Sequence, residues 1–172
     1  MTKTIRIGVA GVAMFAAMSM STVARADTET ADARAEILQA LDLTLTEGSL
    51  DFGLLVVSGD GAITLPPTGP MDCTGQPVAC AGTTDVPDFS VSGTADKAVS
   101  ITVPTGNVTL TNTAAGSTDT LTVNAITTSA ASNEVTLTGG SATFSVGGTL
   151  NFTDGQDAGV YTGSFDVSVD YS

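Results

Sequence analysis

Apolar and polar residues alternate in short stretches along most of the chain after residue 32. The apolar positions of the first stretch are Ala33, Ala35, Ile37, Leu41, Leu43 and Leu45. A period of two is that of an extended strand with one apolar and one polar edge. We therefore predict a strand from Ile37 to Thr46. A helix over 31–41 remains open, because Ala, Glu, Leu and Gln favour helices.

Similar stretches follow at intervals of about 8–12 residues and end at Gly, Pro or Asp, which is typical of a β-sandwich or barrel. The predicted strands are 50–56, 62–65, 88–92, 99–103, 108–111, 120–126, 141–146, 149–152 and 160–171. We predict a turn at Gly147-Gly148, between two of them. Two packed sheets are the simplest way to bury so many half-apolar strands. The expected fold class is therefore an all-β, antiparallel sandwich.

The last predicted strand is the longest and most regular. Its large apolar residues share one face: Tyr161, Phe165, Val167, Val169 and Tyr171. We expect this strand to lie inside a sheet, with that face in the core.

The first 26 residues have the pattern of a secretory signal peptide. Lys3 and Arg6 precede a short apolar stretch, 7–20, and the segment closes on Ala24-x-Ala26. The apolar stretch is shorter than the roughly 20 residues of a spanning helix, although an uncleaved anchor is the alternative. We predict cleavage after Ala26, export through the periplasm, and a final location at the cell surface, in a fimbria or outside the cell. Residues 27–36 would form a flexible mature N-terminus, ahead of one domain at 37–172.

Charge narrows the choice of partners. After cleavage only Arg34 and Lys97 remain against 18 acidic residues, a net charge of −16. Nucleic acid binding requires Lys or Arg to neutralise phosphates, so nucleic acid is excluded as a partner. Anionic lipid surfaces are disfavoured for the same reason, and we expect no membrane span after cleavage.

The two cysteines, Cys73 and Cys80, flank a turn that contains Gly75 and Pro77. In an exported protein, a close pair of cysteines is expected to form a disulfide. Two thiols without a nearby histidine do not complete a zinc site, so we expect no metal there.

The sequence offers little for catalysis. It has no histidine, no nucleophile elbow and no phosphate-binding loop. The acidic residues lie mostly in turns, where Asp commonly accepts hydrogen bonds from its own main chain. A loose Ca²⁺ loop at 153–157 is the alternative, but it lacks the spacing and the terminal Glu of a dedicated loop. We therefore expect no enzyme, no catalytic residues and no cofactor.

Three segments resemble the bacterial family called domain of unknown function 4402. In residues 37–53, a strand of alternating apolar residues and Thr leads into Leu50-Asp51-Phe52-Gly53. Residues 144–150 (Phe-Ser-Val-Gly-Gly-Thr-Leu) are similar to a later step of that family. Residues 159–171, with Tyr, Gly, Phe and Val at alternate positions, resemble its ending. The order and spacing of the segments make the resemblance fairly specific.

That family is in turn similar to pilins of the chaperone–usher type, including spore-coat-U-like and common-pilus subunits. The resemblance implies an immunoglobulin-like sandwich that lacks a strand. A periplasmic chaperone would fill the gap first, and an N-terminal donor strand from a neighbouring subunit would replace it. Expected donor residues are Ala33, Ala35, Ile37, Leu41 and Leu43. If they belong to the domain's own first strand, only residues 27–36 remain to donate.

The same resemblance implies that the last strand flanks the gap and contacts the chaperone, through Tyr161, Phe165, Val167, Val169 and Tyr171. The sequence thus favours a structural subunit of a pilus or fimbria, which polymerises with itself or with related subunits and is assembled with a chaperone and an usher. The alternative is a monomeric secreted or surface-attached sandwich that binds carbohydrate or another surface component.

Overall fold

The computed structural model describes residues 27–172, so the predicted signal peptide lies outside the described residues. The chain divides into two units, Met1–Ala35 and Glu36–Ser172, and the second contains all the strands described below. Residues 27–41 form neither helix nor strand. Within 27–172, no helix is long and apolar enough to cross a membrane.

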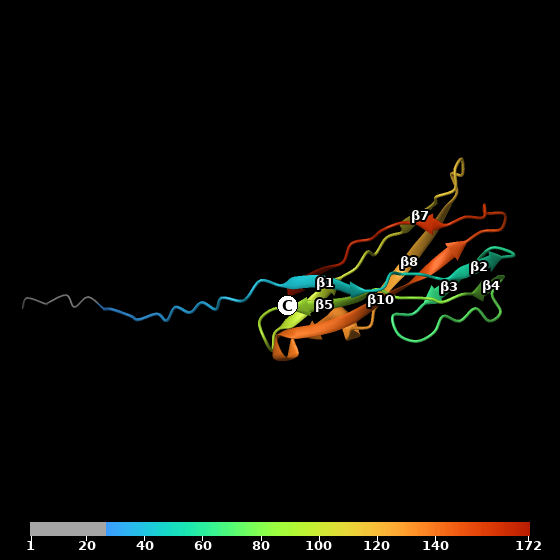
Figure 1. Cartoon of the computed structure of the whole chain (residues 1–172). Helices are drawn as coiled ribbons and strands as arrows, with labels where there is room; N and C mark the ends of the chain where they lie inside the picture. Colours follow the sequence, from blue (N-terminus) through green and yellow to red (C-terminus); the bar gives the residue numbers. More distant parts are fainter. Residues whose placement is uncertain (1–26) are drawn as a thin grey trace, which may run out of the picture. The chain divides into compact units, whose positions relative to one another are not determined.

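The second unit is an all-β, antiparallel sandwich, as predicted, with three sheets around one core (Figure 1). In the described part of the chain, the only helical turns are two 3₁₀ turns, Ala131–Asn133 and Thr138–Gly140. The strands are β1 Asp42–Glu47, β2 Leu54–Val57, β3 Gly61–Leu65, β4 Val78–Ala81, β5 Asp88–Ser92, β6 Ala98–Thr102, β7 Val108–Asn112, β8 Thr120–Thr128, β9 Glu134–Thr136, β10 Ser141–Phe152, β11 Tyr161–Thr162 and β12 Ser168–Tyr171.

The large sheet has the order β1-β5-β10-β8-β7-β11, and β3 also pairs with β10. The first half of β10 pairs with β5, and its second half pairs with both β3 and β8. A second sheet has the order β12-β6-β9, and β2 pairs with β4 in a third. The strand β10 is therefore the centre of the fold, which Figure 1 shows as the long orange strand.

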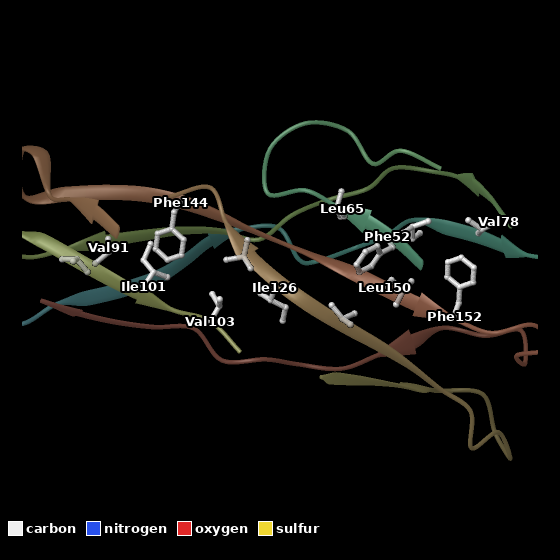
Figure 2. Packing of buried hydrophobic residues seen from close by; sticks show 14 of the residues in the cluster. Phe52, Leu65, Val78, Val91, Ile101, Val103, Ile126, Phe144, Leu150 and Phe152 are labelled. Carbon is white, nitrogen blue, oxygen red and sulfur yellow. The ribbon is translucent and has the colours of Figure 1, made fainter. Parts of the chain in front are cut away.

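The core is one cluster along this central strand. Phe144 from β10 lies with Val91 from β5 and Ile101 from β6 at one end (Figure 2). At the other end, Figure 2 shows the buried side chains Phe52, Leu65, Val78, Leu150 and Phe152. Except for Val78, these residues belong to the predicted alternating stretches, so the period-two pattern indicates much of the core, although Leu54 and Val56 in the same stretch as Phe52 are exposed.

The predicted strand Ile37–Thr46 is too long at its start, because β1 begins only at Asp42. Leu43 and Leu45 then pair with Val91 and Phe89 of β5. The residues before Asp42 have no strand partner among the described residues, so their alternation alone does not make them a strand.

The predicted turn at Gly147-Gly148 is wrong, because β10 runs without interruption from Ser141 to Phe152. A Cβ atom at Gly147 would lie 2.4 Å from the carbonyl oxygen of Leu65 and 2.5 Å from the nitrogen of Pro67. The register with β8 also shifts between Gly147 and Thr149. The glycines therefore serve close backbone packing and a bulge inside a strand.

The long C-terminal strand is also divided. Its first residues, β11, pair with β7 of the large sheet, while β12 pairs with β6 of the second sheet. Residues 163–167 cross between the two sheets and pair with no described strand. The alternating burial is confirmed, since Phe165 and Val167 are half-buried and Ser164 and Asp166 are exposed. The expectation that this strand lies inside a sheet is wrong, because β12 is an edge.

Candidate functional site

Two sheet edges face a common gap. The strand β1 is the outer strand of the large sheet, and β12 is the outer strand of the second sheet. Within residues 27–172, nothing pairs with the outer edge of either strand, nor with the crossing segment 163–167. Unpaired main-chain N–H and C=O groups along such edges are ready to bond to another strand.

A groove of about 230 Å³ lies at this gap, and we call it the edge groove. Its two walls come from the end of β1 and from the crossing segment, and its floor comes from β5, β7 and β8. The lining residues are Leu45, Gly48, Ser49, Leu50, Pro87, Phe89, Val108, Leu110, Val123, Gly163, Ser164 and Phe165. Most of these side chains are apolar, so the edge groove is suited to apolar side chains and not to an ion.

The floor of the edge groove is continuous with the core. Phe89 stacks on Phe144, with ring centroids 5.4 Å apart and planes 14° apart. Val123 is fully buried, whereas Val108 and Leu110 are only half-buried. The half-buried pair sits at the same face of β7 and remains partly open to solvent, so a side chain entering the groove would complete the burial of both.

The predicted donor residues fall into two groups. Leu41 and Leu43 pack against the core of their own chain, so they already belong to the sandwich. Ala33, Ala35 and Ile37 are exposed, and Ile37 is 95% exposed. The exposed members of the predicted donor therefore end at Ile37.

The residues predicted to flank the gap also fall into two groups. Phe165 lines the edge groove, and Val167, Val169 and Tyr171 pack against the core beside it. Tyr161 lies apart in β11, where its hydroxyl donates a 2.7 Å hydrogen bond to the carbonyl oxygen of Asp157. The structure thus brings four of the five residues to the gap or the core next to it.

The sequence did not single out the other lining residues, such as Leu45, Val108 and Leu110. The sequence gives little sign that these residues line a groove, because each belongs to an ordinary alternating stretch. Gly163 is a clearer indication of a special position. A Cβ atom there would lie 2.5 Å from the carbonyl oxygen of Thr109, so only glycine lets the crossing segment approach β7 this closely.

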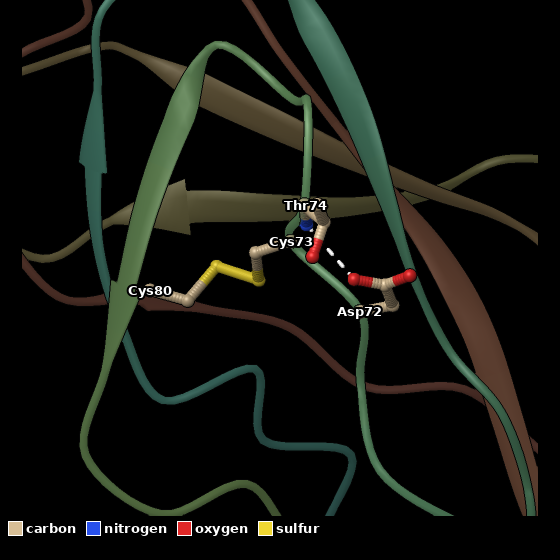
Figure 3. Close-up of a disulfide and its surroundings, with 4 residues drawn as sticks. All are labelled: Asp72, Cys73, Thr74 and Cys80. Carbon is tan, nitrogen blue, oxygen red and sulfur yellow. Dashed lines mark hydrogen bonds between the residues drawn. A yellow bond between two sulfur atoms is a disulfide. The ribbon is translucent and has the colours of Figure 1, made fainter.

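Cys73 and Cys80 form the predicted disulfide (Figure 3). The disulfide ties the loop before β4 to β4 itself, which pairs with β2. In the same loop, Asp72 accepts a 2.8 Å hydrogen bond from the main-chain N–H of Thr74. That bond, with a further one from the Thr74 side chain, holds the pKa of the exposed Asp72 carboxyl below its ordinary value.

Contrary to the prediction, Asp60 and Asp119 do not bond to their own main chain but to a loop distant in the sequence. Asp60 accepts a 2.7 Å hydrogen bond from the N–H of Asp154, and Asp119 accepts one of the same length from the N–H of Asp157. Across the described part of the chain, no three or more His, Cys, Asp or Glu residues are grouped so that they could hold a metal ion. These two carboxylates therefore fasten separate loops to the segment 154–157.

A group of exposed apolar side chains lies on the β2–β4 sheet and does not line the edge groove. Leu54 and Val56 of β2 stand opposite Ala81 and Ala79 of β4, and all four are exposed. The other face of this two-stranded sheet packs on the core through residues such as Val78.

Comparison with protein families finds that residues 43–171 match the model described as "Domain of unknown function (DUF4402)". The match begins in β1 and ends at Tyr171, so it covers the sandwich from its first strand to its last. No curated protein matches the chain.

Proposed function

The chain belongs to the DUF4402 family, and we propose that it is a structural surface protein, a pilus- or fimbria-like subunit that assembles by accepting a strand into the edge groove. The observation that carries this proposal is the apolar groove between the end of β1, an unpaired sheet edge, and the crossing segment 163–167, which pairs with no described strand. An immunoglobulin-like sandwich that lacks one strand would have this arrangement, as the chaperone–usher pilins do.

The backbone of the crossing segment provides the first half of the interaction. From Ser164 to Val167 the side chains alternate between exposed and half-buried, but no described strand bonds to residues 163–167. An incoming strand would hydrogen-bond to this segment or to the outer edge of β1 and place alternate side chains in the groove. Strand addition of this kind combines main-chain affinity with side-chain selection.

The N-terminal segment of a second copy provides the second half. Ala33, Ala35 and Ile37 share one side of an alternating stretch and are exposed in this chain. Ile37 is the largest of the three, and burying an Ile side chain stabilises a complex by about 1.5–3 kcal/mol before the cost of ordering the segment. We propose that Ile37 of one copy enters the edge groove of the next, between Leu45 and Phe165.

This proposal explains the expected partners. An open edge with an apolar groove is prone to uncontrolled pairing, so a subunit of this kind needs a periplasmic chaperone to cover the groove until an usher delivers the next subunit. Export by a cleaved signal peptide, followed by assembly at the cell surface, is the matching location.

The test compares Ile37→Asp with Val160→Asp, a matched control whose side chain is 67% exposed and does not line the groove. The chain and both variants would be expressed in the source cells, with sheared surface material viewed by electron microscopy and purified protein run on size-exclusion chromatography. We expect filaments from the unaltered chain and from Val160→Asp, and none from Ile37→Asp.

Filaments of normal number and length from Ile37→Asp would contradict the role of Ile37. An unaltered chain that is monomeric and forms no filaments would contradict the subunit proposal and favour a self-contained domain that binds carbohydrate or another surface component.

A further inference from the structure

The end of β12 is fastened to the segment that precedes β1. The hydroxyl of Tyr171 donates a 2.8 Å hydrogen bond to the carbonyl oxygen of Gln39 and accepts a 2.7 Å bond from the N–H of Thr94. The N–H of Gln39 in turn donates a 2.8 Å bond to Oγ1 of Thr94. We call these three hydrogen bonds the Tyr171 clip.

The packing around the clip is tight. A Cβ atom at Gly93 would lie 2.4 Å from the Tyr171 hydroxyl oxygen and 2.8 Å from Cδ2 of Leu41. Close by in sequence, Lys97 and Glu36 form an ion pair of 2.6 Å. Residues 36–41 are therefore fixed on the turn between β5 and β6, although they form no strand.

The clip lies at one end of the gap that contains the edge groove. Gln39 meets Tyr171 at the clip, and Leu45 and Phe165 line the groove together. From the clip to the groove, one side of the gap runs forward from Gln39 to Leu45, and the other runs backward from Tyr171 to Phe165. Each side spans six residues. The two sides run antiparallel, and the clip joins them about 20 Å from the groove, at about 3.3 Å per extended residue.

We propose that Tyr171 determines the length of strand that the edge groove accepts, by closing the gap at the clip. This inference rests on the proposed function, since it concerns the same acceptor groove. A strand seated between Leu45 and Phe165 can extend freely away from the clip. In the other direction it meets the Gln39 carbonyl bonded to Tyr171, and it can pass only when those hydrogen bonds break.

The experiment uses two synthetic peptides centred on Ile37. The short peptide has the sequence of residues 35–39, and the long one that of residues 31–43. The long peptide extends six residues to each side of Ile37, so one of its ends reaches the clip whichever way it lies. Fluorescence anisotropy would give the affinity of each peptide for the unaltered mature chain and for Tyr171→Phe, which loses only the hydroxyl.

The control variant is Tyr161→Phe, which removes the hydroxyl of the other tyrosine, bonded to Asp157 away from the groove. Thr94→Val weakens the same clip, because it removes the hydroxyl that accepts the Gln39 N–H and keeps the two hydrogen bonds of Tyr171. Thermal unfolding of each protein would accompany the titrations, so that affinities are compared only between folded proteins.

We expect the unaltered chain and Tyr161→Phe to give the same ratio of the two affinities, because in both proteins the clip stops the end of the long peptide that points towards it. Tyr171→Phe should raise this preference for the long peptide roughly tenfold, which is the effect of one to two added net hydrogen bonds, and Thr94→Val, which removes one bond of the clip, should raise it less. An unchanged ratio of affinities in both clip variants would overturn the inference and leave the proposed function standing. Binding of neither peptide to any of the proteins would overturn both.

Discussion

Gly159 packs against the side chain of Asn112 so closely that a Cβ atom at position 159 would lie 2.2 Å from the Asn112 Oδ1. Asn112 is 5% exposed and is the one buried polar side chain of the described residues. Its Oδ1 accepts a 2.9 Å bond from the N–H of Ala114, and its Nδ2 donates a 3.3 Å bond to the carbonyl oxygen of Asp157. Asn112 thus fastens the end of β7 to the loop before β11.

We expect Asn112→Ala to lower the free energy of unfolding by about 1–3 kcal/mol, because it leaves buried hydrogen-bonding groups without their partner. Gly159→Ala should cost a similar amount, because its methyl group displaces the amide. Urea unfolding at neutral pH would measure both. The control is Asn107→Ala, at an exposed position, and a loss as large in that variant would show that the contacts of Asn112 are not the cause.

The disulfide between Cys73 and Cys80 spans seven positions. Replacing both cysteines by Ser should lower the free energy of unfolding by about 2 kcal/mol, the value expected for so short a loop. Urea unfolding with and without a reductant would test this. The reductant should destabilise the unaltered chain by the same amount and leave the double variant unchanged, and a further loss in the double variant would point to another cause.

The low pKa of Asp72 makes its turn sensitive to acid. The folded turn favours the ionised carboxyl, so its contribution to stability is present above the ordinary Asp value of 3.8 and is lost as the pH falls through the lower folded value. An NMR pH titration should therefore place the Asp72 midpoint below 3.8. Thr74→Val, which keeps the main-chain N–H and removes the hydroxyl, should move the midpoint only part of the way back. A full return to the ordinary value would assign the effect to the hydroxyl alone.

The edge groove gives a prediction for assembly. Leu45 lines it and is 54% exposed, whereas Leu54 is 68% exposed on β2 and does not line it. Leu45→Asp would place a charge where an apolar side chain should enter, so we expect it to reduce filament number at least tenfold while the fold persists. Leu54→Asp should leave filaments intact. Counts by electron microscopy, with circular dichroism as the check on folding, would decide, and equal counts for the two variants would contradict the role of the groove.

Much of the fold could be predicted from residue alternation, and the exceptions have physical causes. The stretches 88–92 and 108–111 became β5 and β7 because their apolar residues meet the core at every second position. The strand β4 was missed because its four residues, Val78–Ala81, include no polar residue that could alternate, and β9 was missed because three residues are too few for a clear period. The turn expected at Gly147 failed because glycine also marks close backbone contact, and only the position of Leu65 distinguishes the two cases.

The candidate site was less predictable, since it depends on which strands become neighbours. Leu45, Val108 and Phe165 line one groove but are far apart in the sequence, and each looks like an ordinary core residue there. The disulfide was predictable because seven positions separate its cysteines. The Tyr171 clip was not, because its partner Gln39 is 132 positions away.

The central position of β10 has a consequence for the order in which the protein can fold. Leu65 of β3 pairs with Gly148, and Ser92 of β5 pairs with Ser141, so both earlier strands depend on a strand from the last third of the chain. Contacts between such distant residues form slowly. During synthesis the emerging chain cannot complete its sandwich until β10 is present, so the buried core lacks its central strand for most of translation.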